Sequence, residues 1–122
     1  MQKKALIIDD EEIVRNYVLR ALSGRGWAVS GLADGAAAIA LIAKEDFDIV
    51  VCDIKMPDMR GEEVIRRIKT LRPAARIIVI TGSVSNLADP LVPGVKVDGH
   101  LIKPFGIDEI RELAEKVLKA EG

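Results

Sequence analysis

Apolar residues along the chain alternate between short continuous runs and longer stretches with helical spacing. The continuous runs predict five strands, at residues 5–8, 28–32, 47–52, 76–80 and 99–102. Apolar residues three and four positions apart predict helices at residues 13–22, 34–44, 61–71 and 107–120. Apolar strands that alternate with helices are typical of a parallel sheet covered on both faces. The pattern therefore predicts one α/β domain over residues 1–122.

Residues 84–98 interrupt this alternation because Pro90 and Pro93 fall three positions apart. Proline inside a helix removes a hydrogen bond and clashes with the preceding turn, at a cost of ~3 kcal/mol or more. We therefore expect about one helical turn or an irregular loop here, by those proline limits. The apolar residues that should still cover the sheet edge or mark an interface are Leu87, Leu91 and Val92.

Composition indicates the kind of core, the classes of partner and the cellular compartment to expect. Hydrophobic residues make up 49% of the chain and aromatic residues only 3%, so the core must be aliphatic. The net charge of −1 gives no overall bias toward nucleic acid or anionic membrane. The one cysteine, Cys52, lies in an apolar run and fits a small buried hydrophobe. The apolar run directly before Asp9 is only four residues long, too short for a signal peptide or a membrane span, and we expect a cytoplasmic protein.

Polar residues follow the predicted strands at the points where these strands end. Asp9 and Asp10 come after the first strand, and Asp53, Thr81 and Lys103 come after the third, fourth and fifth. Parallel strands present their carboxyl ends at one edge of the sheet, where α/β proteins bind ligands. Three carboxylates, a hydroxyl and an ammonium group are therefore expected to converge there.

This set of groups suits phosphoryl transfer. Crowded carboxylates repel each other unless their pKa values rise or a cation lies among them. Oxygen ligands of this kind suit Mg²⁺, which uses one or two carboxylates and keeps several waters. Lys103 would neutralise phosphoryl oxygens, Thr81 would donate a hydroxyl, and a carboxylate such as Asp53 can form an aspartyl-phosphate.

Each residue taken alone has an ordinary explanation. Aspartate is common in turns and helix caps, and Lys103 and Thr81 could be a surface lysine and a cap. The convergence of all five residues is what favours a site. Competing motifs are weaker, because Gly24-Arg25-Gly26 follows a helix and lacks the third glycine of a dinucleotide fingerprint.

Four motifs, in this order and at this spacing, resemble those of bacterial two-component response-regulator receiver domains. They are ALIIDD at residues 5–10, DIKMPDMRG at 53–61, ITG at 80–82 and KPF at 103–105. The resemblance covers essentially the whole chain and is closest in kind to chemotaxis regulators. It implies a flavodoxin-like three-layer sandwich with a five-stranded parallel sheet of order 2-1-3-4-5.

The resemblance also implies roles around the phosphoryl group. Asp53 matches the phosphoacceptor, Asp10 a direct Mg²⁺ ligand, and Asp9 an acidic neighbour that acts on the metal through water. Lys55 stands where the family uses a backbone carbonyl as a metal ligand.

Further matches concern the switch and the shape of the site. Thr81 matches the switch hydroxyl, and Lys103 the lysine that pairs with the phosphoryl group. His100 stands where the family often has a Tyr or Phe that rotates inward on activation. The smaller matches are Gly82, which leaves the site open, Pro57 and Gly61 in the turn after Asp53, and a cis Lys103-Pro104 peptide.

The function implied is a phosphorylation-controlled switch that takes its phosphoryl group from a sensor histidine kinase or phosphotransfer protein. It would then control an output domain or target protein, with no nucleic-acid or membrane contact of its own, and a homodimer is compatible. Such a domain catalyses only the phosphorylation and dephosphorylation of its own Asp53. A phosphatase acting on other substrates is disfavoured, because Lys55 stands where a common phosphatase pattern has a second aspartate. The alternative is a receiver-like interaction module that phosphorylation does not regulate.

Overall fold

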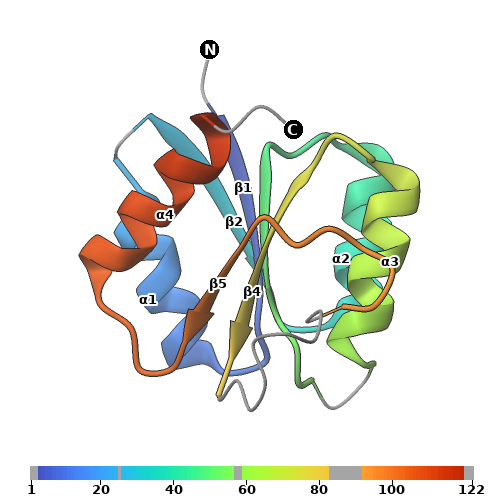
Figure 1. Cartoon of the computed structure of the whole chain (residues 1–122), viewed down its shortest axis with the longest axis horizontal. Helices are drawn as coiled ribbons and strands as arrows, with labels where there is room; N and C mark the ends of the chain where they lie inside the picture. Colours follow the sequence, from blue (N-terminus) through green and yellow to red (C-terminus); the bar gives the residue numbers. More distant parts are fainter. Residues whose placement is uncertain (1–2, 25, 57–58, 83–91, 120–122) are drawn as a thin grey trace.

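A computed structural model describes residues 3–24, 26–56, 59–82 and 92–119. Its five strands form one parallel sheet of order β2-β1-β3-β4-β5 (Figure 1), which confirms the predicted topology. The strands are β1 (Lys3–Ile8), β2 (Trp27–Leu32), β3 (Ile49–Asp53), β4 (Arg76–Thr81) and β5 (Gly99–Ile102).

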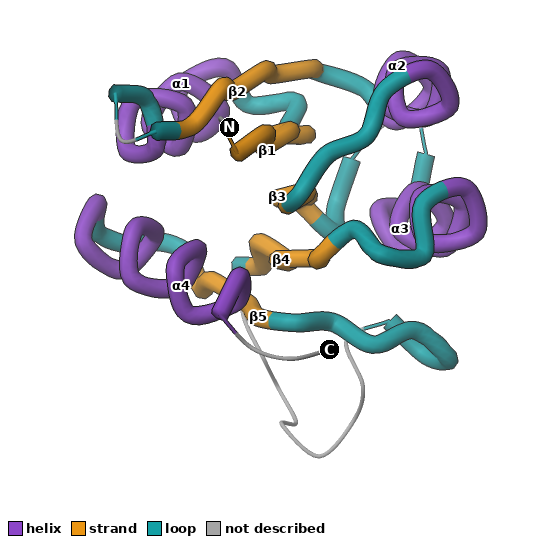
Figure 2. Tube along the Cα trace, turned by 90° about the horizontal axis from the view of Figure 1, so that it is seen from above, coloured by secondary structure: helices purple, strands orange, loops and turns teal. Residues whose placement is uncertain are grey.

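Four helices cover the two faces of this sheet. They are α1 (Glu12–Leu22), α2 (Gly35–Lys44), α3 (Gly61–Leu71) and α4 (Ile107–Lys119). Figure 2 shows α1 and α4 on one side of the strands and α2 and α3 on the other. The fold is therefore the predicted three-layer sandwich.

The core is aliphatic and divided by the sheet. Along β1, Ala5 and Ile7 pack toward α1 and α4, whereas Leu6 and Ile8 pack toward α2 and α3. Successive side chains of a strand point to opposite faces, so a strand buried on both sides reads as a continuous apolar run. Cys52 is fully buried between the sheet and the α2–α3 layer, as its apolar neighbours in the sequence predicted.

Local signals in the sequence account for several element ends. Asp34 caps α2, because its Oδ1 accepts a hydrogen bond from the Ala37 N–H at 2.7 Å. Gly24 follows α1 with a positive φ of 78°, a conformation that glycine adopts without strain. Two strand starts differ from the prediction by two residues. β1 begins at Lys3 rather than at residue 5, and β3 begins at Ile49, so that Phe47, expected in the strand, packs into the core before it.

The segment with the two prolines is described only in part. Residues 92–98 contain no helix, in agreement with the expected effect of Pro93. Val92 is fully buried against the α2–α3 side of the sheet, as predicted. Pro90, Leu87 and Leu91 lie outside the described residues, so the remaining expectations there stay predictions. Within the described residues, no helix has both the length and the apolar character needed to cross a membrane.

Candidate functional site

The strands bring the predicted residues to one edge of the sheet. Asp9 comes directly after β1, Asp53 ends β3, Thr81 ends β4, and Lys103 comes directly after β5. The strand ends are level, because Ile8 is in register with Cys52, Asp53 with Ile80, and Thr81 with Ile102. The parallel topology thus gathers chemistry from four distant parts of the chain.

Three carboxylates form a compact cluster at this edge. Asp9, Asp10 and Asp53 each place a carboxylate oxygen within 4.8 Å of the others. Asp9 and Asp53 are buried, and Asp10 is exposed. Asp9 Oδ1 accepts a hydrogen bond from the Glu11 N–H at 2.9 Å, whereas Asp9 Oδ2 is the buried side-chain oxygen without a hydrogen-bond partner in the described residues.

This environment disfavours a charged Asp9 in the absence of a cation. Burial raises the pKa of Asp9 to about 6, and the nearby charge of Asp53 adds to this, although the Glu11 N–H opposes it. A buried carboxylate oxygen without a donor, beside two further carboxylates, suits a hard divalent cation. The oxygen donors of the cluster therefore fit Mg²⁺.

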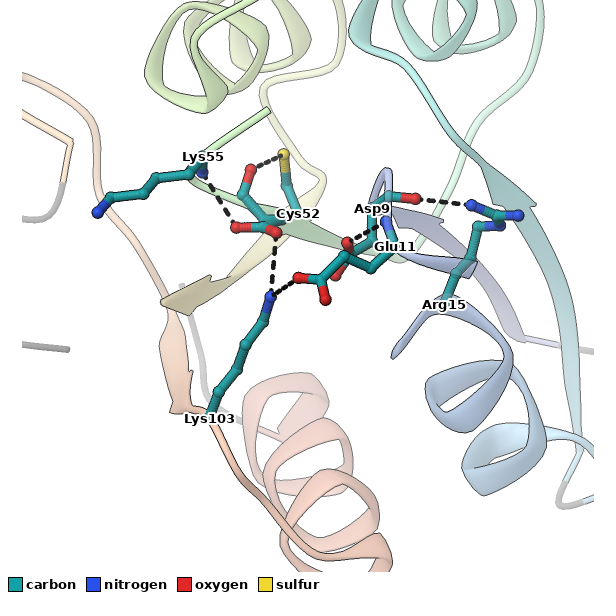
Figure 3. Close-up of polar contacts among 7 residues, drawn as sticks. Asp9, Glu11, Arg15, Cys52, Lys55 and Lys103 are labelled. Atoms are coloured by element: carbon teal, nitrogen blue, oxygen red, sulfur yellow. Dashed lines mark hydrogen bonds and ion pairs between the residues drawn. The ribbon is translucent and has the colours of Figure 1, made fainter. Parts of the chain in front are cut away.

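Lys103 is the cation that the structure places in the cluster. Its Nζ donates to Asp53 Oδ2 at 3.2 Å and to Glu11 Oε1 at 2.6 Å (Figure 3). Partial burial alone would lower the pKa of Lys103, but the hydrogen bonds to Glu11 and Asp53 outweigh it and raise the pKa. The Lys103 N–H donates to the Thr81 carbonyl at 2.9 Å, which fixes where the side chain starts. The Lys103-Pro104 peptide is cis, as expected.

The backbone after β3 holds the Asp53 carboxylate from the other side. The Lys55 N–H donates to Asp53 Oδ1 at 3.0 Å, while the Lys55 side chain extends away from the cluster (Figure 3). A Cβ atom at Gly61 would come within 2.5 Å of the Asp53 carbonyl oxygen and the Ile54 Cα. Only glycine therefore lets α3 begin this close to Asp53. Pro57, the other residue predicted for this turn, lies outside the described residues.

The two predicted switch residues lie in different surroundings. Thr81 is 5% exposed at the end of β4, next to the residue in register with Asp53. His100 is exposed on β5, in register with Val79 on β4. Gly82 is exposed, and a Cβ atom added there would meet nothing within 4 Å, which leaves the edge of the site open.

Glu11 belongs to the site although the sequence did not point to it. It follows the acidic pair directly and precedes α1, so it reads as an ordinary acidic residue at a helix start. Its bond to Lys103 spans 92 positions. Only the folded arrangement of β1 and β5 reveals that pairing.

Comparisons with known proteins agree with this geometry. Residues 5–115 match the family model of the response regulator receiver domain. The chain is 32% identical over 120 residues to sporulation initiation phosphotransferase F of Bacillus subtilis, which covers 97% of this chain and 95% of that protein. The chain spans about half the length of transcriptional regulators that it also matches.

Solved structures with the same fold include two response regulators. The chemotaxis response regulator CheY4 of Vibrio cholerae is 29% identical, with a TM-score of 0.87 over 97% of this chain and 100% of that chain. TrrA of Thermotoga maritima, solved in complex with Mg²⁺-BeF, is also 29% identical. Its TM-score is 0.84 over 96% of this chain and 100% of that chain.

Proposed function

Because this chain belongs to the response regulator receiver domain family of two-component systems, we propose that Asp53 is its phosphoacceptor. The observation that carries the proposal is the position of the Asp53 carboxylate. It is buried at a strand end, held by the Lys55 N–H and by Lys103 Nζ, and lies beside two further carboxylates. The donor would be a phosphorylated histidine of a sensor kinase or phosphotransfer protein.

The chemistry of the step is a displacement at phosphorus. A carboxylate oxygen of Asp53 forms the new O–P bond while the N–P bond of the phosphohistidine breaks, and the imidazole keeps the electron pair. Such transfer needs chiefly positioning and neutralisation of charge. The Lys55 N–H orients the carboxylate, and Lys103 lies close enough to Asp53 to bind phosphoryl oxygens.

We propose that Asp10, Asp53 and the backbone carbonyl of Lys55 hold Mg²⁺, with Asp9 acting on it through water. The clustered carboxylates and the buried Asp9 oxygen without a donor support this assignment. When bound, Mg²⁺ would neutralise the negative charge that phosphorylation adds to the cluster. The same residues would support the later hydrolysis of the aspartyl-phosphate, which makes this domain a catalyst of its own phosphorylation and dephosphorylation only.

Phosphorylation is proposed to change the conformation through Thr81 and His100. The Thr81 hydroxyl would close on the phosphoryl group, and the exposed His100 ring would turn toward the sheet edge. The ring chemical shifts of His100 should then change when Asp53 is phosphorylated. Superimposable NMR spectra of the two forms would exclude this role for His100.

The partners are proposed from the same family membership. A histidine kinase or phosphotransfer protein would supply the phosphoryl group in the cytoplasm, and an output domain or separate target would read the switched form. The net charge of −1 gives no overall bias toward nucleic acid or anionic membrane, and direct contact with either is not proposed. A homodimer is compatible with such a switch.

The deciding experiment is phosphorylation by acetyl phosphate and Mg²⁺, followed by intact mass spectrometry. Wild-type protein should gain one labile phosphoryl group, and Asp53→Asn should gain none because an amide is a poor nucleophile. Asp46→Asn is a matched control, since Asp46 is highly exposed and pairs with Arg72 away from the cluster. A wild-type protein that gains nothing would contradict the proposal and favour an interaction module that phosphorylation does not regulate.

A further inference from the structure

The Glu11 side chain pairs with a distant lysine rather than with the start of its own helix. Glu11 occupies the N-cap position of α1, where a side-chain oxygen commonly accepts a hydrogen bond from the first turn of the helix. Its side chain makes no such bond. Instead, Glu11 Oε1 lies 2.6 Å from the Nζ of Lys103, which follows β5.

Lys103 is therefore shared between two carboxylates. Its Nζ is closer to Glu11 Oε1, at 2.6 Å, than to Asp53 Oδ2, at 3.2 Å. Glu11 is not a member of the compact group formed by Asp9, Asp10 and Asp53. Its side chain is 56% exposed, so it can leave the lysine at little cost in burial, whereas the Asp53 side chain is only 6% exposed.

We propose that Glu11 is a positioning residue that competes with the phosphoryl group for Lys103 and thereby slows phosphorylation of Asp53. The inference rests on the proposed role of Asp53 and adds a control to it. A phosphoryl group carries up to about two negative charges and seeks the same ammonium group. Glu11 holds that ammonium to one side and adds a negative charge along the path of an anionic donor.

The ordinary explanation of Glu11 is an acidic residue that stabilises the start of a helix. That role predicts a small change in stability after substitution and no change in the rate of phosphorylation. Glu11→Gln separates the two explanations, because the amide keeps the size of the side chain and removes its charge. The Glu11 N–H, which donates to Asp9, is part of the backbone and is retained.

The first experiment compares phosphorylation rates with acetyl phosphate at saturating Mg²⁺. Glu11→Gln should be phosphorylated roughly three- to tenfold faster than wild type, the range expected for one nearby, half-exposed charge. Glu12→Gln is the matched control, since Glu12 is the next residue, is exposed, and carries the same charge. Its rate should stay within about twofold of wild type, as expected for a screened surface charge.

A second experiment tests whether Glu11 acts through Lys103. In a double-mutant cycle, the gain from Glu11→Gln should fall to about twofold or less in a Lys103→Met background, leaving only the direct charge effect. The affinity for beryllium fluoride in the presence of Mg²⁺, measured by fluorine NMR, should follow the same pattern. This readout does not depend on turnover of a phosphodonor.

The outcomes separate this inference from the proposed function. If wild type gains a phosphoryl group on Asp53 but Glu11→Gln is no faster, or is slower, the role of Glu11 is overturned and the function stands. A full gain that persists in the Lys103→Met background would overturn the positioning role, because the effect would then not pass through the lysine. If wild type gains no phosphoryl group, both ideas fall together.

Discussion

At the amino edge of the sheet, three arginines donate to carbonyl groups in the last turns of helices, whereas at the carboxyl edge one lysine is shared between two carboxylates. Arg111 bonds the Ala21 carbonyl of α1 at 2.7 Å, and Arg72 bonds the Ile42 carbonyl of α2 at 2.9 Å. Arg76 bonds the Val117 carbonyl of α4 at 2.8 Å. The last carbonyls of a helix lack partners within it and carry partial negative charge, so a guanidinium group matches both needs.

The contrast shows that stability and function are placed at opposite edges. The arginines satisfy acceptors and match charge, which stabilises the docked helices. The carboxyl edge instead holds the buried Asp9 Oδ2 close to like charges, and among the described residues this oxygen has no hydrogen-bond partner. Crowded carboxylates of this kind lower the stability of the free protein, and binding of a cation would restore it.

The largest expected effect is a pH-dependent change in the stability of the protein, and it comes from Asp9. Its pKa is raised to about 6 from an ordinary value of 3.8, so the folded state binds the proton more tightly than the unfolded state. Stability should therefore fall as pH rises from about 4 to 6, by up to about 3 kcal/mol from this group. Asp9→Asn should remove this loss and be more stable than wild type at pH 7.5 without metal.

Urea denaturation in the presence of a chelator checks this across the pH range. The difference between wild type and Asp9→Asn measures the contribution of Asp9 together with its interactions with Asp53 and Lys103. Asp108→Asn, which removes an exposed carboxylate in the first turn of α4, is the control for loss of an aspartate outside the cluster. Parallel curves for wild type and Asp9→Asn would contradict the strained state of the cluster.

The second effect is stabilisation of the carboxyl edge by Mg²⁺. At a concentration ten times the dissociation constant, binding should add about 1.4 kcal/mol to the free energy of unfolding. Asp10→Ala should weaken binding and slow phosphorylation of Asp53 together. Isothermal titration measures the affinity, and thermal unfolding with and without Mg²⁺ measures the stabilisation. An unchanged affinity in Asp10→Ala would remove Asp10 from the proposed site.

At the amino edge, loss of an arginine should have the opposite sign from Asp9→Asn. Arg111→Met removes a charged donor from the Ala21 carbonyl while keeping an apolar stem, and should cost about 1 kcal/mol in stability. Arg20→Met, an exposed arginine in the last turn of α1, is the matched control and should cost less than about 0.5 kcal/mol. Equal losses from the two variants would argue against a specific role for the Arg111 bond.

The smallest effect is expected for an exposed ion pair on the first two turns of α3. Arg67 Nε lies 3.2 Å from Glu63 Oε1 one helical turn away, and both side chains are about half exposed. Glu63→Gln should cost only about 0.3 kcal/mol, because solvent screens such pairs. Urea denaturation at low and high salt provides the measurement. A loss above about 1 kcal/mol would show that exposed pairs in this protein are stronger than usual.

Residues whose roles follow from local pattern could be predicted from the sequence. Burial on both faces makes β1 and β3 read as apolar runs, so the carboxylates after them were expected at one edge. Contacts that depend on how distant elements dock could not be predicted. The bond from Lys103 to Glu11 and the bond from Arg111 to the Ala21 carbonyl join residues 92 and 90 positions apart in the sequence. The predicted start of the third strand at Phe47 was wrong for a related reason. Core packing and strand pairing both favour apolar residues, so an apolar residue alone does not distinguish them.

The arginine bonds at the amino edge should also affect the rate at which the folded protein unfolds. Arg111 and Ala21 are 90 positions apart, Arg76 and Val117 are 41 apart, and Arg72 and Ile42 are 30 apart. Such bonds can form only after both partner elements have docked, so we expect them late in folding. Interactions absent from the transition state act on the unfolding rate, and each loss of about 1.4 kcal/mol would shorten the native-state lifetime about tenfold. The three arginines would thus slow unfolding from the edge of the sheet opposite the proposed phosphoacceptor.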